Sequence, residues 1–264
     1  MKKILITNDD GIFGAGIEPL VKEVSKIANV IVVAPEKEKS AVSHSLTLHE
    51  AIRSRKIGHN SYIINGTPAD CVRFGFIALC KYKLDLVISG INQGPNLGND
   101  VIYSGTVGGA REGALLDVPS LAVSLVIKTG KYFKTAASFA SRLSDILLNT
   151  EKGSEIRMRM VGSKEKLERI FLNVNIPDAP ENKIAGVEIT TLGKRIYDEV
   201  VHRRKDPYGM PYYWLKGRLL SGKNIPGTDI NAVNHSRVSI TPLSVNNTDK
   251  ETLDFLRKFL KNEF

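Results

Sequence analysis

The sequence is short of cysteine and has no apolar run long enough to cross a membrane. Its 264 residues include two cysteines, Cys71 and Cys80, and one tryptophan. Both cysteines fall in one predicted helix, which separates them by about 13.5 Å on opposite faces, whereas a disulfide needs Cα atoms within roughly 7 Å. The longest apolar run, residues 121–127, is far shorter than the ~20 residues of a membrane span. We therefore expect reduced, buried cysteines and a soluble, cytoplasmic protein.

Positive charge is in excess, and most of the excess lies in the second half of the chain. The formal net charge is +9. Residues 1–130 hold 14 Lys and Arg against 12 Asp and Glu, whereas residues 131–264 hold 23 against 16. A basic protein suggests nucleic acid as a partner, but this excess lies away from the motifs described below. Attraction of a small anionic substrate explains the charge equally well, so we expect no stable nucleic-acid partner.

Short apolar runs alternate with helical patterns in the first half of the chain. Uninterrupted apolar strands between helices favour a parallel sheet that is covered on both faces. We predict an α/β fold: a three-layer, Rossmann-like, mostly parallel sheet with helices on both faces, plus a β-rich C-terminal appendage with extended hairpins. Residues 1–150 would form the core that binds metal and phosphate. Residues 151–264 would form a mixed α/β extension with oligomerisation hairpins and a C-terminal helix.

Four local patterns make sharper predictions. Thr67-Pro68-Ala69-Asp70 is a helix start, with Thr as N-cap, Pro at the first position and an acid at the third. Residues 45–48 and 62–64 are expected to form hairpin strands. The stretch 151–169 is highly charged and is predicted to be a surface insertion. A capping box, Thr248-x-x-Glu251, is expected to open the last helix.

Polar side chains follow three of the predicted strands. Asp9 and Asp10 follow the first strand, Ser40 lies in the loop after the second, and Asn92 follows the third. Ligands of parallel sheets bind beyond the carboxyl ends of the strands, so these side chains are expected to converge. Two carboxylates, a hydroxyl and an amide oxygen suit Mg²⁺, Mn²⁺ or Ca²⁺ and argue against zinc. A shell with about two open positions is what a catalytic ion needs.

The segment 103–110 is expected to open a helix that attracts phosphate. Bare N–H groups at a helix N-terminus bind anions, and the hydroxyls of Ser104 and Thr106 would add donors. Gly108 and Gly109 weaken a helix by about 1 kcal/mol each, so either close packing or an approaching ligand must favour them. The closing Gly-Lys-Ser/Thr of a Walker A loop is missing.

Six motifs occur in order along the first half of the chain: Ile6-Thr7-Asn8-Asp9-Asp10-Gly11, Val33-Ala34-Pro35, Lys39-Ser40, Gly66-Thr67-Pro68-Ala69-Asp70-Cys71, Ser89-Gly90-Ile91-Asn92-x-Gly94-Pro95-Asn96 and Tyr103-Ser104-Gly105-Thr106-Val107. Taken together and in order, these motifs resemble the survival protein SurE family of metal-dependent nucleotidases. The resemblance is specific over residues 1–130 and weaker beyond them.

The resemblance implies hydrolysis of nucleoside 5′-monophosphates, often of 3′-monophosphates, and in some members of polyphosphate. It implies one divalent ion per subunit, with Mg²⁺ or Mn²⁺ expected, and a homodimer or homotetramer that exchanges hairpin and C-terminal segments. The implied metal ligands are Asp9, Asp10, Ser40 and Asn92, of which Asp9 and Asp10 are the catalytic pair. The implied phosphate-contacting residues are Asn96, Ser104, Gly105 and Thr106.

The expected reaction is in-line attack of a metal-polarised water on the phosphoryl group. Attack by an aspartate is the competing mechanism, and we prefer water because both carboxylates are committed to the ion. Asp229 and His235 are candidates for assisting protonation, although an isolated histidine is more often structural.

Three other classes of protein share some of these features. A signalling receiver domain also places paired acids after its first strand, but it needs an aspartate where this chain has Ser89-Gly90. A dinucleotide-binding enzyme would carry G-x-G-x-x-G after that strand, and the glycines at 11, 14 and 16 lack this spacing. A nucleic-acid binder gains from the basic second half but lacks a recognition motif.

Overall fold

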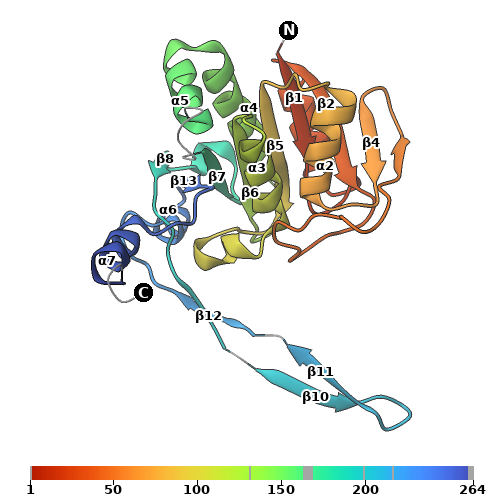
Figure 1. The fold of residues 1–264 in the computed structure, drawn as a ribbon, viewed down its shortest axis with the longest axis vertical. Helices are drawn as coiled ribbons and strands as arrows, with labels where there is room; N and C mark the ends of the chain where they lie inside the picture. Colours follow the sequence, from red (N-terminus) through yellow and green to blue (C-terminus); the bar gives the residue numbers. More distant parts are fainter. Residues whose placement is uncertain (1, 131, 163–168, 199, 216, 261–264) are drawn as a thin grey trace.

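A nine-stranded sheet forms the centre of the molecule, and helices cover both of its faces (Figure 1). This computed structural model describes residues 2–130, 132–162, 169–198, 200–215 and 217–260. The strand order is β3-β4-β2-β1-β5-β6-β7-β13-β8. The strands are β1 (Lys3–Thr7), β2 (Asn29–Pro35), β3 (Ser54–Lys56), β4 (Ser61–Ile64), β5 (Leu86–Gln93), β6 (Ser120–Val126), β7 (Ile170–Pro177), β8 (Val187–Ile189) and β13 (Val238–Ser244).

The central strands of this sheet, from β4 across to β7, all run parallel. Strands β3 and β13 pair antiparallel with β4 and β7, and β8 pairs parallel with β13. The predicted mostly parallel α/β class is confirmed.

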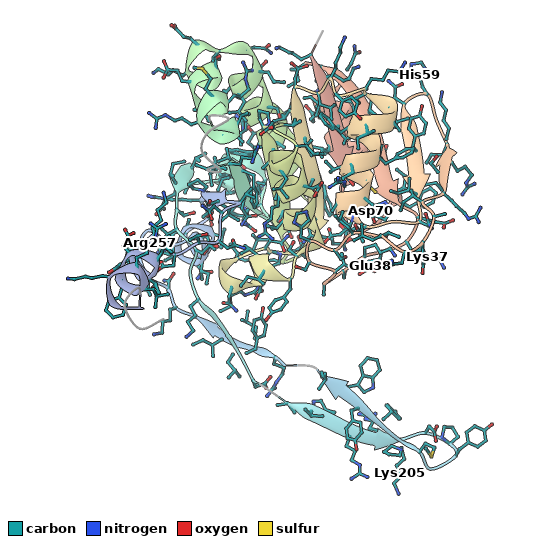
Figure 2. The ribbon with its side chains drawn as sticks, viewed as in Figure 1. Lys37, Glu38, His59, Asp70, Lys205 and Arg257 are labelled. Carbon is teal, nitrogen blue, oxygen red and sulfur yellow. The ribbon has the colours of Figure 1, made fainter. Side chains whose placement is uncertain are left out.

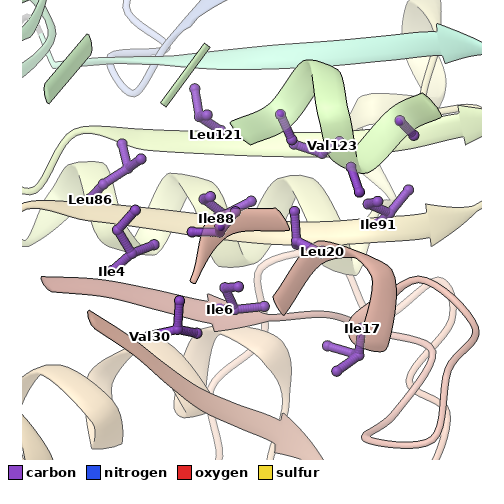
Figure 3. Close-up of a cluster of buried hydrophobic side chains, with 14 of the residues drawn as sticks. Ile4, Ile6, Ile17, Leu20, Val30, Leu86, Ile88, Ile91, Leu121 and Val123 are labelled. Carbon is purple, nitrogen blue, oxygen red and sulfur yellow. The ribbon is translucent and has the colours of Figure 1, made fainter. Parts of the chain in front are cut away.

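Alternation along the strands divides the core into layers. Ile4 and Ile6 pack with Leu20 on one face, and Figure 3 shows these side chains together. Leu5, between them, packs with Cys71 on the other face. The first face is covered by α1 (Ile17–Val24) and α4 (Phe133–Asn149), and α5 (Glu151–Val161) packs against α4. The second face is covered by α2 (Pro68–Phe74), the π-helix η1 (Gly75–Leu79) and α3 (Gly105–Leu115). Successive side chains of a strand point to opposite faces, which produces this division.

A long arm leaves the sheet between β8 and β13 (Figure 1). It contains two antiparallel pairs, β9 with β12 and β10 with β11, and the second pair is exposed along its whole length. The predicted hairpins of the C-terminal appendage are confirmed. The bounds are β9 (Arg195–Tyr197), β10 (Val201–Lys205), β11 (Pro211–Leu215) and β12 (Leu219–Gly222); the remaining elements are the 3₁₀ helices η2 (Gly98–Ile102) and η3 (Glu181–Lys183), α6 (Asp229–Asn234) and α7 (Lys250–Leu260).

The helix start at Thr67 is confirmed, and the one at Thr248 is wrong. Thr67 accepts a hydrogen bond from the Asp70 N–H, and the Asp70 carboxylate accepts one from the Thr67 N–H. The last helix begins at Lys250, and its first turn is capped by Asp249, which accepts a 2.7 Å bond from the N–H of Thr252. Asp caps a helix at least as well as Thr, so the neighbouring residue takes the position.

The expected strand at residues 45–48 is absent, and β4 pairs instead with β3. The N–H and hydroxyl of Thr47 both donate to Asp70, and the Thr67 hydroxyl donates to the carbonyl of Ser45. Side chains at the start of α2 therefore take the backbone partners that a strand would have used.

The charged stretch after residue 150 is partly helical. Helix α5 packs on α4, and Thr150 caps it by accepting from the Gly153 N–H at 3.0 Å. Residues 163–168 of the predicted insertion lie outside the described residues. A domain division at residue 150 stays a prediction; β7 and β13 continue the central sheet beyond it. In the described parts of the chain, no helix has the length and apolar character of a membrane span.

Candidate functional site

A cleft of about 1940 Å³ opens at the carboxyl edge of the sheet. The chain leaves β1 toward β2 on one side and later returns as β5 on the other, so the strand order switches at β1. A switch point of this kind is where parallel α/β sheets bind ligands. All four residues predicted to ligate metal line the cleft, together with Asn96 and Ser104 of the predicted phosphate set.

Asp9 is held by the first turn of α3. Its side chain accepts a 2.5 Å hydrogen bond from the hydroxyl of Thr106 and a 3.0 Å bond from the N–H of the same residue. Gly105 permits this approach, since a Cβ there would lie 3.0 Å from the Cβ of Asp9. Burial raises the pKa of Asp9 despite these donors, and the charge of Glu38 adds to the rise. An ionised Asp9 therefore costs free energy here unless a cation is present.

Asp10 is next to Asp9 in the chain, and its pKa is also raised. The N–H of Gln93 donates to its carboxylate at 3.0 Å. Burial, followed by the charge of Asp9, raises the pKa of Asp10 to about 6. Glu38, which Figure 2 labels in the loop after β2, contributes to the same rise. Three carboxylates thus face one cleft, an arrangement that a divalent cation would relieve.

Ser40, in the loop after β2, and Asn92, near the carboxyl end of β5, line the same cleft. The N–H of Lys39 donates to the carbonyl of Asp9 at 2.7 Å, which ties the β2 loop to the end of β1. The hydroxyl of Ser40 donates to Glu38 at 2.6 Å. The amide nitrogen of Asn92 donates to the carbonyl of Gly94 at 2.9 Å, which leaves its oxygen as the free end. Among the described residues no three His, Cys, Asp or Glu side chains form a metal cluster; the predicted set is a mixed one.

The predicted phosphate residues divide into two pairs. Asn96 and Ser104 line the cleft, whereas Gly105 and Thr106 lie behind it, with both Thr106 donors directed at Asp9. The hydroxyl of Ser104 accepts from the N–H of Val107 and caps α3. The side-chain nitrogen of Asn96 donates to Ser124 at 2.8 Å.

The backbone of Asn96 is clasped by strand β7. The Asn96 N–H donates to the side-chain oxygen of Asn175, and the Asn175 amide donates back to the carbonyl of Asn96, both at 2.9 Å. Asn173 adds a further 2.9 Å bond to the same carbonyl. A loop rich in Gly, Asn and Pro is thereby fixed at the cleft by side chains about 80 residues away.

The two glycines of α3 are explained by packing. A Cβ on Gly108 would lie 2.5 Å from the carbonyl oxygen of Ser43, and one on Gly109 would lie 2.7 Å from the hydroxyl of Ser89. Of the two alternatives that the sequence left open, close approach of protein neighbours is the correct one.

A buried carboxylate that the sequence did not reveal holds the Ser40 loop against α3. Glu112 is almost fully buried and contacts His44 at 2.7 Å and Arg73 at 2.9 Å, one with each carboxylate oxygen. A single acid among small and apolar helix residues carries no local signal of this role, because its partners are distant in the chain.

The far wall of the cleft comes from the root of the arm, which sequence analysis also missed. Lys194, Arg195 and Tyr197 line it. Arg195 and Tyr197 both contact the carboxylate of Asp100, each at 2.5 Å. These contacts join the arm to η2 and bring Lys194 and Arg195 into the lining of the cleft.

Asp229 and His235 do not lie in the cleft. The carboxylate of Asp229 is fully buried and accepts from the N–H groups of Gly98 and Gly193, both at 2.7 Å, so it fastens η2 to the arm root. Burial raises its pKa despite these bonds. His235 contacts the carbonyl of Asn231 at the C-terminal end of α6.

The strand switch and the acidic cleft beside a helix N-terminus define an α/β protein with a cleft suited to a cation and an anion. The chain belongs to the family described as Survival protein SurE, which matches residues 4–199. The predicted family is confirmed.

Relatives share nearly the full length of the chain. Proteins named 5′-nucleotidase SurE from Citrifermentans bemidjiense and Desulforudis audaxviator are 43% identical over 258 residues and 44% identical over 264. The first alignment covers 97% of this chain and 98% of the relative, and the second covers 97% of each. The crystal structure of Sure protein from Aquifex aeolicus, at 38% identity, superimposes with a TM-score of 0.81 over 97% of this chain and 98% of that one.

Proposed function

We propose that this protein is a divalent-metal-dependent phosphomonoesterase that hydrolyses nucleoside 5′-monophosphates to nucleoside and phosphate. The observation that carries the proposal is the single cleft where Asp9, Asp10, Ser40 and Asn92 meet beside the start of α3. Its relatives are named 5′-nucleotidase SurE, and these names support the same activity. Nucleoside 3′-monophosphates and short polyphosphate are proposed as further substrates.

The donor set fits one Mg²⁺ or Mn²⁺ ion per subunit. Asp9, Asp10, Ser40 and Asn92 would hold it, since they supply only oxygen ligands. The raised pKa values of both aspartates support this. Burial removes the water that would stabilise each carboxylate charge, and a bound cation would stabilise that charge instead. When bound, the ion would neutralise phosphate charge and lower the pKa of a water molecule.

The chain's own groups orient the phosphate. Ser104 accepts from Val107 and keeps its hydroxyl proton for a phosphate oxygen. The Gly105 N–H belongs to the first turn of α3, where intrahelical acceptors are lacking. Asn96 is held rigidly enough by Asn175 to place its side chain reproducibly. Thr106 acts on the metal side of the site, through Asp9.

The proposed chemistry is in-line attack of water on phosphorus. The new P–O bond forms as the ester P–O bond breaks; the attacking water gives up one proton, and the nucleoside oxygen takes up one proton and leaves as a hydroxyl. Positioning and charge stabilisation are what such a reaction needs from a protein. Asp9 and Asp10 are committed as ligands, which favours water over an aspartyl nucleophile.

We further propose a homodimer or homotetramer in the cytoplasm. The exposed arm strands β10 and β11, with Tyr213 and Trp214, support assembly. The buried, unbridged Cys71 and Cys80 support a reducing compartment.

Phosphate release from a panel of nucleoside monophosphates and polyphosphate, with and without Mg²⁺ or Mn²⁺, tests the proposal. Asp9→Asn is expected to abolish release while the circular dichroism spectrum stays unchanged. Asp145→Asn, a carboxylate on α4 outside the cleft, is the matched control and should keep full activity. Metal-independent release, or unchanged turnover of Asp9→Asn at saturating metal, would refute it. Salt-dependent oligonucleotide binding with no phosphate release would favour a nucleic-acid binder instead.

A further inference from the structure

Of the three aromatic side chains that line the cleft in the described part of the chain, Phe13 and Tyr103 are the most exposed, whereas Tyr197 is held by Asp100. Phe13 is 89% exposed and Tyr103 is 63% exposed, and both line the cleft. An isolated exposed apolar side chain needs no explanation, but two rings that border one polar cleft are a feature of a binding surface. Their exposure leaves much of each ring accessible to a ligand in the cleft.

The backbone beneath each ring is fixed. The N–H of Ile12, next to Phe13, donates to the carbonyl of Pro35 at 3.0 Å. The carbonyl of Tyr103 accepts from the N–H of Ser43 at 2.9 Å, and its own N–H donates to the carbonyl of Asp100 at 3.0 Å. Binding would therefore have to order the torsions of each ring but not the backbone that carries it, which limits the entropy cost.

The two rings are close in sequence to the predicted metal and phosphate residues. Phe13 is three residues beyond Asp10, on the metal side, and Tyr103 directly precedes Ser104, on the phosphate side. A nucleoside monophosphate carries its aromatic base one sugar away from its phosphate. A phosphate held at Ser104 therefore leaves the base within reach of rings that border the same opening.

We propose that Phe13 and Tyr103 bind the substrate's base by stacking and so select nucleotides over phosphate esters that lack a base. This inference rests on the proposed function and deepens it. Every base has a π-face, so stacking tolerates all of them. The contact therefore favours nucleotides as a class over sugar phosphates.

The test compares AMP with ribose 5-phosphate, which differs by the absence of the base. For the Phe13→Ala/Tyr103→Ala double variant, kcat/KM for AMP is expected to fall at least 10-fold, while kcat/KM for ribose 5-phosphate stays within 2-fold of wild type. A 10-fold loss corresponds to about 1.4 kcal/mol, within the range of base–aromatic stacking. Adenosine should inhibit the wild type competitively and the double variant at least 10-fold more weakly.

Conservative and remote variants complete the design. Tyr103→Phe keeps the ring and should retain wild-type discrimination between AMP and ribose 5-phosphate. Tyr82→Ala removes an exposed ring outside the cleft, and kcat/KM should stay at the wild-type value for both substrates. Equal losses for the two substrates, or an unchanged kcat/KM for AMP in the double variant, would overturn the stacking proposal while metal-dependent release by the wild type still stands. Absence of release from every ester by the wild type would instead refute the proposed function.

Discussion

The hydroxyl of Thr106 donates a 2.5 Å hydrogen bond to one carboxylate oxygen of Asp9, and its N–H donates at 3.0 Å to the other. The Asp9 carboxylate therefore occupies the position in which a helix N-terminus ordinarily receives an anion. The start of α3 orients the proposed metal ligand, and the charge that it can offer to a phosphate is partly satisfied from within the protein.

Thr106→Val is expected to weaken Mn²⁺ binding roughly 10- to 100-fold, because a hydrogen bond to a charged group contributes about 1.5–3 kcal/mol. Isothermal titration calorimetry on the purified protein measures this directly. Thr129→Val is the matched control, since the Thr129 hydroxyl donates to Asp178 away from the cleft. Equal Mn²⁺ affinity in the two variants would show that Asp9 needs no orientation by Thr106.

Asp10→Asn is expected to stabilise the metal-free protein at neutral pH. Burial and Asp9 raise the pKa of Asp10 to about 6, above its value of 3.8 in an unfolded chain. Between these values the folded state binds more protons, so stability from this group is lost as pH rises through that window and changes little above it. The variant should melt above the wild type at pH 7.5, and the difference should shrink as pH falls below 6. Thermal melts in chelator across pH 4.5–8 measure it, and a difference independent of pH would contradict the cause given.

Glu112→Gln is expected to lower the free energy of unfolding by about 1–3 kcal/mol, since it leaves His44 and Arg73 without a buried ionic partner. Urea denaturation measures this. Glu181→Gln removes a half-exposed pair with Arg142 and should cost less than about 1 kcal/mol. Equal effects of the two substitutions would mean that the Glu112 cluster is not a stabilising anchor.

Asn175→Leu is expected to raise KM for AMP several-fold while the Mn²⁺ affinity stays unchanged, because it releases the backbone of Asn96. Thr190→Val breaks another buried hydrogen-bond pair, with Ser239 and Thr241, and controls for lost stability. Steady-state kinetics at saturating metal make the comparison. Identical KM changes in both variants would assign the effect to stability alone.

The features that the sequence predicted correctly depend on neighbouring residues or on one rule of sheet topology. Asp9, Asp10 and Ser40 come after recognisable strands, so one topological rule places them at one edge. Asn92 reaches the same edge, but the expectation that it follows its strand is wrong, because β5 continues to Gln93. The role of all four as ligands stays a prediction. The helix start at Thr67 needed only its own next three residues.

Partners distant in the chain explain what was not predictable. Residues 45–48 have a strand-like sequence, but their backbone groups bond to side chains of α2 and its cap: the N–H of Thr47 donates to Asp70, and the carbonyl of Ser45 accepts from Thr67. Arg195 lines the cleft from a segment about 100 residues beyond Asn92, and no sequence pattern in the arm predicts that position. At Thr248 the error was a choice between adjacent capping residues, which propensity alone does not resolve.

The walls of the cleft span the chain from Asp9 to Gly217, which has a consequence for the order of events on the ribosome. At roughly 5–20 residues per second, Thr106 is synthesised about 5–20 s after Asp9, and Arg195 follows after a similar interval. Until Thr106 emerges the paired acids lack their orienting helix, and until Arg195 emerges the opening lacks its basic side. Competence for catalysis therefore arrives late in translation, as a property of the nearly finished polypeptide.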